Sequence, residues 1–150
     1  MLREGGLADP QVAALITHHR TESSATTPIC NAHSLDSEGL SDPTISFVSA
    51  WDGDALLGIG ALKMIDIDHG ELKSMRTAPD HLRKGVAREI LEYLMDKARE
   101  RGARRLSLET GTAPMFQPAI ALYRRQGFVE CATFGGYPPS PHNLFMTMDL

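Results

Sequence analysis

A short basic loop between a strand-like and a helix-like segment is the part of this sequence best suited to chemistry. It lies within TAPDHLRKGVAREIL, residues 77–91, where Arg83, Lys84 and Gly85 come just before a stretch with helical spacing. Backbone N–H groups at a helix N-terminus have no partner within the helix, and the helix dipole favours negative charge there. The sequence therefore predicts a phosphate-binding loop, with a solvated basic turn as the alternative.

The glycine pattern of this loop narrows the choice of ligand. The loop lacks GxxxxGK[ST], which is typical of ATPases, and it lacks the dinucleotide pattern GxGxxG because Gly85 is its only glycine. These differences argue against ATP hydrolysis and NAD binding. A nucleotide-binding protein that uses the same basic loop remains an alternative hypothesis.

Other clusters of chemically capable residues have simpler interpretations. The segment DIDHGE, residues 66–71, contains several metal-ligand types, but it lacks the spacing of a calcium loop and is more typical of a hairpin turn. His18 and His19 are adjacent on a predicted helix, so they should face different directions. Cys131 is expected in the core, and Cys30 has no recognisable base to activate it. We therefore expect neither a metal site nor a cysteine nucleophile.

Hydrophobic periodicity predicts the elements that precede the loop. Residues 9–20 have helical spacing, with Asp9 as the N-cap and Pro10 in the first turn. Three alternating segments follow, and the turn sequences DGD and DIDHG separate them, so we expect antiparallel strands in series at residues 44–51, 55–65 and 71–77.

The period changes from two to 3.6 at Gly85. A helix is predicted from there to about residue 100, with Gly102 just beyond its end. The next strand should be parallel to the one before the helix, because a right-handed β-α-β crossover joins them. The remaining predicted elements are a strand at 104–110, a helix at 117–128 that ends at Gly127, and strands at 128–134 and 143–150. This order predicts an α+β fold with a mixed sheet.

Composition sets broader limits. The chain has 150 residues, of which 42% are hydrophobic and 23% charged, as expected for one globular domain spanning residues 1–150. A formal net charge of -4 argues against a general nucleic-acid partner. The two cysteines form no disulfide framework, and no apolar stretch is long enough to span a membrane. We therefore expect a soluble cytoplasmic protein with no membrane partner.

Two segments resemble motifs of the GNAT superfamily of N-acetyltransferases. RTAPDHLRKGVAREIL is similar to the acetyl-CoA loop Q/R-x-x-G-x-G/A, with Gly85 and Ala87 in its last two fixed positions. Leu82 stands where glutamine or arginine is usual, so the neighbouring cations would have to supply the charge. AIALYRRQGF, residues 119–128, is similar to the family segment A-x-x-L-Y-x-x-x-G-F. The resemblance extends from about residue 44 to the end, and it includes short segments similar to those of small bacterial proteins of the YsnE type.

This resemblance implies a mixed, mostly antiparallel central sheet of about six to seven strands, with flanking helices and a β-α-β acetyl-CoA-binding core. In the family, acetyl-CoA is a co-substrate that lies between two parallel strands that splay apart, and no metal is needed. The strands would be residues 71–77 and 104–110 here. The expected coenzyme-binding residues are Met75, Arg76 and Thr77 on the strand and Leu82, Arg83, Lys84, Gly85, Val86, Ala87 and Arg88 on the loop and helix.

The resemblance also implies catalytic groups. Glu71 matches the position of a glutamate base that removes a proton from the acceptor amine, with Glu109 as its rival and an exposed strand-end carboxylate as the alternative. Tyr123 matches a tyrosine that acts as general acid toward the CoA sulfur, and the alternative is an amphipathic tyrosine at the helix–sheet boundary. Phe116 stands where many members have a CoA-binding asparagine. That contact is either lost or taken over by Gln117.

The function implied by the resemblance is acetyl-CoA-dependent N-acetyl transfer, made directly to a primary amine of a small molecule or peptide. The alternative is a non-catalytic CoA-binding regulatory module. Acceptor contacts are expected from residues 26–39 and 135–143, with His33, Tyr137 and His142 as candidates. The sequence leaves open the identity of the acceptor and whether the protein forms a homodimer.

Overall fold

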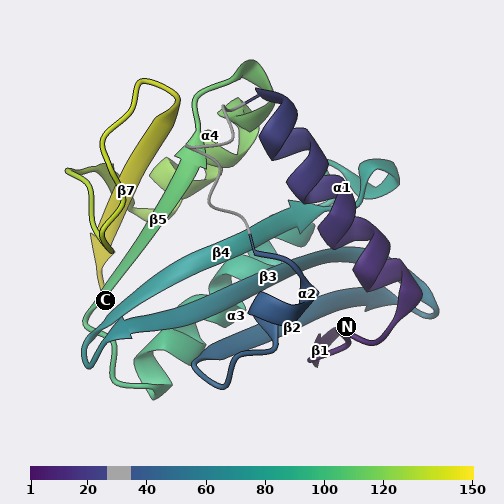
Figure 1. The fold of residues 1–150 in the computed structure, drawn as a ribbon. Coiled ribbons are helices and arrows are strands. Elements are labelled where there is room, and N and C mark those ends of the chain that lie inside the picture. Colours follow the sequence, from purple (N-terminus) through teal and green to yellow (C-terminus); the bar gives the residue numbers. More distant parts are fainter. Residues whose placement is uncertain (27–34) are drawn as a thin grey trace.

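The protein is built around one seven-stranded sheet with helices on both faces (Figure 1). The computed structural model describes residues 1–26 and 35–150. The strand order is β1-β2-β3-β4-β5-β7-β6, and only the β4–β5 pair is parallel among neighbouring strands in this described part. The strands are β1 (Leu2–Glu4), β2 (Ile45–Asp52), β3 (Ala55–Asp66), β4 (His69–Thr77), β5 (Arg105–Gly111), β6 (Val129–Glu130) and β7 (Asn143–Asp149). The predicted α+β class with a mostly antiparallel sheet is confirmed.

The helices form two layers, with α1 and α2 in front of the sheet and α3 behind it in Figure 1. One hydrophobic cluster joins α1 and α2 to β2 and β3, and the other joins α3 and α4 to the opposite face of the sheet. The helices are α1 (Pro10–Thr26), α2 (Ser37–Leu40), α3 (Val86–Glu100) and α4 (Gln117–Gln126), with short 3-10 turns η2 (Pro79–His81) and η3 (Pro114–Phe116). No helix in these described residues is both long and apolar enough to span a bilayer.

The ends of the main helices follow the predicted capping chemistry. Asp9 accepts a hydrogen bond from the backbone N–H of Gln11 at 2.8 Å, as an N-cap before Pro10 should. At the end of α4, Gly127 has a φ of 112°, and the next N–H donates to the carbonyl of Tyr123 at 3.0 Å. This is the predicted Schellman stop, which satisfies a carbonyl that the helix itself cannot.

Strands β4 and β5 pair over only part of their length and then separate. Its parallel pairing covers only residues 69–72 of β4 and 105–108 of β5, and the remaining halves of the two strands are not paired with each other. Their divergence is visible in Figure 1. On the other side of β4, Ser74 and Met75 together face the single residue Gly60 of β3, which makes a β-bulge, and Ser74 has a φ of 54°. The bulge bends β4 where it leaves β5.

Several sequence-based boundaries need correction. Strand β1 was not predicted, because three residues are too few for a periodic signal. Helix α1 runs six residues beyond the predicted end. The predicted strand at 128–134 is wrong for most of its length, since β6 has only two residues. Beyond it, Phe134 packs its ring against Phe145 and Tyr137, and this aromatic packing diverts the chain from the sheet. Cys131 is half-buried and not in the core.

Candidate active site

A cavity of about 940 Å³ lies where β4 and β5 separate. Its walls come from α1, the second half of β4, the loop before α3, the start of α3, the end of β5 and α4. The structure brings most of the predicted site residues to this one space. Those that line it are Glu71, Met75, Arg76, Thr77, Leu82, Arg83, Gly85, Val86, Ala87, Arg88, Glu109 and Tyr123.

The loop between β4 and α3 has the geometry of an anion cradle. Arg83 and Gly85 have φ values of 61° and 79°, so the chain turns through the left-handed region twice just before the helix. Helix α3 begins with no side-chain cap, which leaves its first N–H groups available to a ligand. A Cβ at Gly85 would meet nothing within 4 Å, so the space above the helix end is open.

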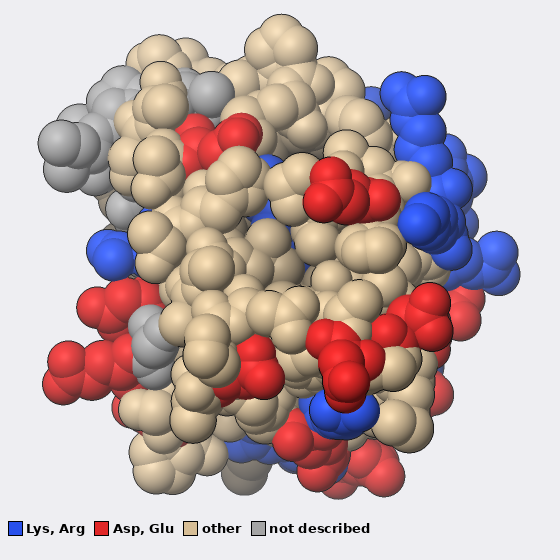
Figure 2. All heavy atoms as spheres, turned by 90° about the vertical axis from the view of Figure 1, so that its right-hand side faces the viewer, with Lys and Arg blue, Asp and Glu red and all other residues tan. Residues whose placement is uncertain are grey.

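Of the three basic residues expected beside this loop, Arg83 and Arg88 line the cavity and Lys84 does not. The Nζ of Lys84 lies 3.2 Å from Nδ1 of His81. Arg125 of α4 also lines the cavity. Figure 2 faces this end of the molecule and shows Lys and Arg side chains gathered along its upper right-hand edge, beside a surface with several separate Asp and Glu patches. This end of the cavity therefore has open backbone N–H donors and three arginines, which come from the loop, from α3 and from α4.

Glu71 belongs to a buried polar cluster. Only 3% of the residue is exposed, so the alternative of an exposed strand-end carboxylate is wrong. Lys73 Nζ lies 3.3 Å from Glu71 Oε2, and the same ammonium donates to the Tyr137 hydroxyl at 2.8 Å. The Tyr137 hydroxyl lies 2.9 Å from Glu71 Oε2 and 3.3 Å from Oε1. The resulting triangle holds a carboxylate at the cavity wall.

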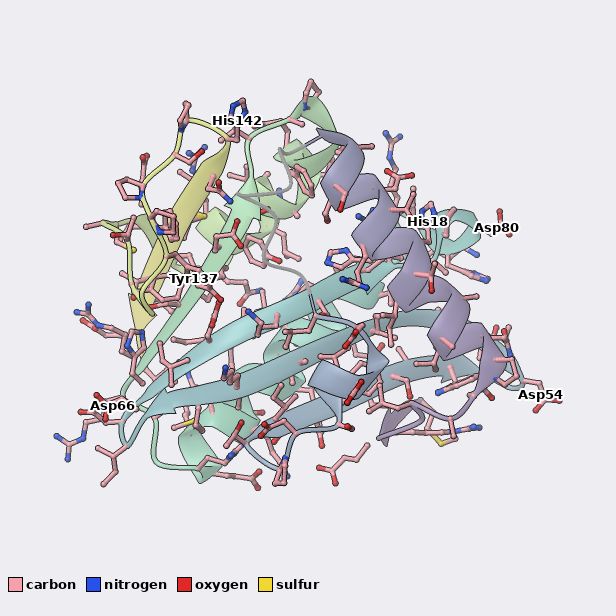
Figure 3. The ribbon with its side chains drawn as sticks, viewed as in Figure 1. His18, Asp54, Asp66, Asp80, Tyr137 and His142 are labelled. Atoms are coloured by element: carbon pink, nitrogen blue, oxygen red, sulfur yellow. The ribbon has the colours of Figure 1, made fainter. Side chains whose placement is uncertain are left out.

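Tyr137 reaches this triangle from the loop before β7. Burial and the negative charge of Glu71 raise the pKa of Tyr137 above its ordinary value, so its hydroxyl stays protonated and donates to the carboxylate. In Figure 3, Tyr137 lies on the β7 side of the sheet, and His18 lies on α1 across the opening. Of residues 135–143, Tyr137 contacts Glu71 behind the cavity wall but does not itself line the cavity. His142 is exposed and far from Tyr137 in this view.

The rival carboxylate has its own partner. Glu109 lies on β5 and accepts a hydrogen bond from the side-chain amide of Asn143, the first residue of β7. Glu71 and Glu109 both line the cavity, so position alone does not choose between them as a base. His33 lies outside the described residues.

Tyr123 and Phe116 form the α4 side of the cavity. Tyr123 is 5% exposed, and burial raises its pKa above the ordinary value. The ring of Phe116 lies so close to Gly111 that a Cβ at this glycine would overlap it. Gln117 is exposed and donates to the carbonyl of Thr112 at 3.4 Å, and it does not line the cavity. A coenzyme contact by Gln117 would therefore require this side chain to move.

Sequence reasoning missed a pair that joins α1 to β4. Arg76 Nε donates to His19 Nδ1 at 3.0 Å, and both residues line the cavity. His18 lines it as well, but it pairs with Glu22 at 3.4 Å and not with Arg76, so the adjacent histidines have different partners. His18, His19, Glu22 and Ser23 of α1 all line the cavity. Only the packing of α1 on the sheet could have revealed this pair.

The segment at 66–71, which contains several metal-ligand types, forms no metal site within the described part of the chain. Among residues 1–26 and 35–150, no group of three or more His, Cys, Asp or Glu side chains is placed to hold an ion. The segment at 66–71 forms a hairpin turn in which Asp66 accepts from the N–H of Ile67 at 2.7 Å. His69 Nε2 lies 2.6 Å from Ser107 Oγ. These side chains serve the turn and the sheet.

Comparisons with known proteins agree with this architecture. The sequence profile of the acetyltransferase (GNAT) family matches residues 12–128. YsnE of Bacillus subtilis (strain 168), named an uncharacterized N-acetyltransferase, is 46% identical over 96% of this chain and 95% of its own length. YedL of Escherichia coli (strain K12), named in the same way, is 44% identical over 99% of this chain and 94% of its own length. The crystal structure of an aminoglycoside 6'-N-acetyltransferase complexed with coenzyme A is only 14% identical but superposes with a TM-score of 0.72, covering 99% of this chain and 96% of that one.

Proposed function

The chain belongs to the acetyltransferase (GNAT) family and is an N-acetyltransferase, and we propose that it moves an acetyl group from acetyl-CoA directly to a primary amine of a small molecule or peptide. The observation that carries this proposal is the cavity that opens where β4 and β5 stop pairing and that ends at the uncapped start of α3. A long, thin substrate could place its diphosphate at the start of α3 and its reactive group between β4 and β5.

At one end, the N–H groups of residues 83–88 and the nearby arginines would hold the diphosphate. The open space above Gly85 lets an oxygen approach the backbone closely, and the helix dipole favours its charge. Further along, the unpaired edge of β4 offers backbone groups of Met75 and Thr77 to the pantetheine arm. The bulge at Ser74 bends this edge away from β5 and makes room for that arm.

At the other end, the amine must lose a proton before it can attack the thioester carbon. The ammonium first gives one proton to a base. The neutral amine then forms the C–N bond as the C–S bond breaks, the nitrogen gives a second proton to solvent, and the sulfur leaves as a thiolate. Glu71 is the base we propose. Its Oε2 is engaged by Lys73 and Tyr137. Among the described residues Oε1 has only the longer contact of 3.3 Å, so we propose that Oε1 receives the proton.

Tyr123 would act on the leaving thiolate. Because burial raises the pKa of Tyr123, and an ordinary cysteine thiol has a pKa of about 8.5, complete proton transfer from this phenol to a thiolate is uphill. The role that fits is a hydrogen bond donated to the sulfur as its charge develops. Water can supply the proton after the product leaves.

A thiol-release assay with acetyl-CoA tests the proposal. The panel should contain amino acids, polyamines, aminoglycosides and peptides, and acetylated products should be confirmed by mass spectrometry. We expect at least one amine to be acetylated and the Glu71→Gln variant to be much slower with it. Thermal unfolding with acetyl-CoA, ATP or NAD tests the coenzyme separately, and stronger protection by either nucleotide would contradict the proposal.

A further inference from the structure

Two buried polar atoms on β4 face the cavity without a partner. Arg76 Nη2 and Ser74 Oγ have no hydrogen-bond partner within the described part of the chain, and both residues line the cavity. Ser74 is only 8% exposed. A buried donor without a partner costs about 1–3 kcal/mol, and more when it is charged. The cavity is therefore incomplete without a polar ligand near this part of β4.

The charge of Arg76 indicates what kind of ligand that is. Burial lowers the pKa of Arg76, but a guanidinium remains protonated in proteins, so the charge stays. Its hydrogen-bond partner does not neutralise it. Burial lowers the pKa of His19 to about 3, so this imidazole is neutral and accepts through Nδ1. Glu22, one turn further along α1, acts on Arg76 only as a secondary electrostatic influence.

The strand register places Arg76 on the same face of the sheet as Lys73, a member of the buried polar cluster around Glu71. Arg76 pairs with Ile59 and Lys73 pairs with Ala61, and both partners pack in the cluster beneath α1. Paired residues on neighbouring strands share a face, so Arg76 and Lys73 point the same way. Leu72 pairs with Leu62 and faces α3 instead. Arg76 thus lies on the side where Glu71 would meet the acceptor, while α3 with its basic loop lies behind the sheet.

We infer that Arg76 binds an anionic group of the acceptor, so the acceptor is an amine that also carries a carboxylate or a phosphate. This inference rests on the N-acetyl transfer proposed above. The guanidinium fork suits a planar carboxylate, and His19 positions it by holding Nε. The ammonium of the same acceptor would lie toward Glu71 and Glu109, whose carboxylates attract it. Arg76 would then bind the anionic group of the acceptor, and the carboxylates would bind its ammonium group.

The kinetic test compares matched acceptors and matched variants. Take an acceptor that carries both an amine and a carboxylate and that the enzyme acetylates. The corresponding carboxamide should have a kcat/KM lower by about tenfold to a hundredfold, as expected for loss of a charge-assisted hydrogen bond. Arg76→Gln should raise the acceptor KM by a similar factor, remove the preference for the acid and leave the KM for acetyl-CoA unchanged. Arg99→Gln is the control, because Arg99 pairs with Asp96 on the solvent face of α3. A raised KM for acetyl-CoA in Arg76→Gln, with acceptor preference intact, would assign Arg76 to the coenzyme and overturn the inference.

His19 is tested as a positioning residue. His19→Leu removes the acceptor of the Arg76 Nε hydrogen bond, so we expect a higher acceptor KM with kcat largely kept. His19→Gln offers a carbonyl oxygen in its place and should recover part of the affinity. An equal fall in kcat for both variants, with KM unchanged, would contradict this role. Circular dichroism and thermal melting should show that each variant is folded.

A binding test separates the anion site from turnover. Ligand-observed NMR in the presence of CoA can compare the N-acetyl derivatives of glycine, β-alanine and γ-aminobutyrate with their carboxamides, and N-acetyl phosphoethanolamine adds the phosphate arm. A preference for anions that Arg76→Gln abolishes supports the inference even if no amine on the panel is acetylated. Equal binding of every acid and its amide would overturn it. Failure of acetyl transfer alone would instead count against the proposed function.

Discussion

The two ends of the cavity are built in opposite ways. The proposed coenzyme end is a single run of residues from Leu82 to Arg88, which would bind through backbone N–H groups, a helix dipole and exposed side chains. The acceptor end is assembled from α1, β4, β5 and the loop before β7, and its polar side chains are buried against one another. One end therefore depends on local conformation, and the other depends on tertiary packing.

This difference has a chemical reason. A diphosphate is the same in every reaction with acetyl-CoA, so a loop and a helix end can hold it with little help from side chains. An acceptor amine must be oriented and deprotonated, which requires a few charged groups fixed in a dry environment. The buried Lys73 ammonium is stable there because Glu71 and Tyr137 are its partners. Substitutions at the acceptor end should consequently have larger effects than those at the coenzyme end.

The largest effect is expected at Glu71. Glu71→Gln should lower kcat by about 10²- to 10⁴-fold, as expected for loss of a general base, with little change in CoA affinity. Glu71→Ala should in addition destabilise the protein by about 3–5 kcal/mol, because it leaves the buried Lys73 ammonium without its carboxylate. Steady-state kinetics and urea unfolding measure the two effects. Glu109→Gln is the matched comparison, and if it were the slower variant, the base would be Glu109.

Tyr123→Phe should have the next largest effect. Losing a hydrogen bond to a developing charge lowers kcat by about tenfold or more. The ring would keep its edge-to-face contact with Phe128, whose centroid lies 5.7 Å away, so stability should change little. CoA affinity should stay within about twofold by isothermal titration calorimetry. A variant with the kcat of the native protein would remove Tyr123 from the mechanism.

Gly85→Ala probes the coenzyme end. A left-handed alanine costs about 1–2 kcal/mol, and its methyl group would project into the open space where an oxygen should sit. We expect CoA affinity to fall by about tenfold with kcat nearly unchanged. Gly53→Ala is the control, because Gly53 has a φ of 57° in the β2–β3 turn, and a Cβ there also meets nothing within 4 Å. If both variants lost stability alike but neither lost CoA affinity, the backbone cradle at Gly85 would be disproved.

The smallest effect concerns the pH dependence of stability. The pKa of His19 is about 3 in the folded protein and near 6.5 when unfolded, so the unfolded state binds the proton first as the pH falls. Stability from this group is present above pH 6.5 and is lost toward pH 3, with about 1–2 kcal/mol lost by pH 5. Urea unfolding of the native protein and of His19→Gln at each pH gives the difference. A difference that stays constant with pH would show that His19 is not held neutral.

Much of the fold could be predicted from the sequence because its signals are local. The change of period at Gly85, the glycines after α3 and α4 and the alternation of β2, β3 and β4 all arise within short windows. The prediction failed where a local signal was too short or was overridden. Strand β1 exists only because its three residues pair with β2, and the chain after β6 leaves the sheet because aromatic rings pack beside it.

By itself, the sequence indicated the loop and helix N-terminus of the proposed coenzyme end, since both lie in consecutive residues. It also indicated Glu71 and Tyr123 as candidates. Only the tertiary structure decided what surrounds them. Tyr137 meets Glu71 across 66 positions and Arg76 meets His19 across 57, and no pattern in the chain predicts such pairs. Long-range contacts of this kind depend on how the helices and loops pack over a finished sheet, and that packing is a property of the whole fold.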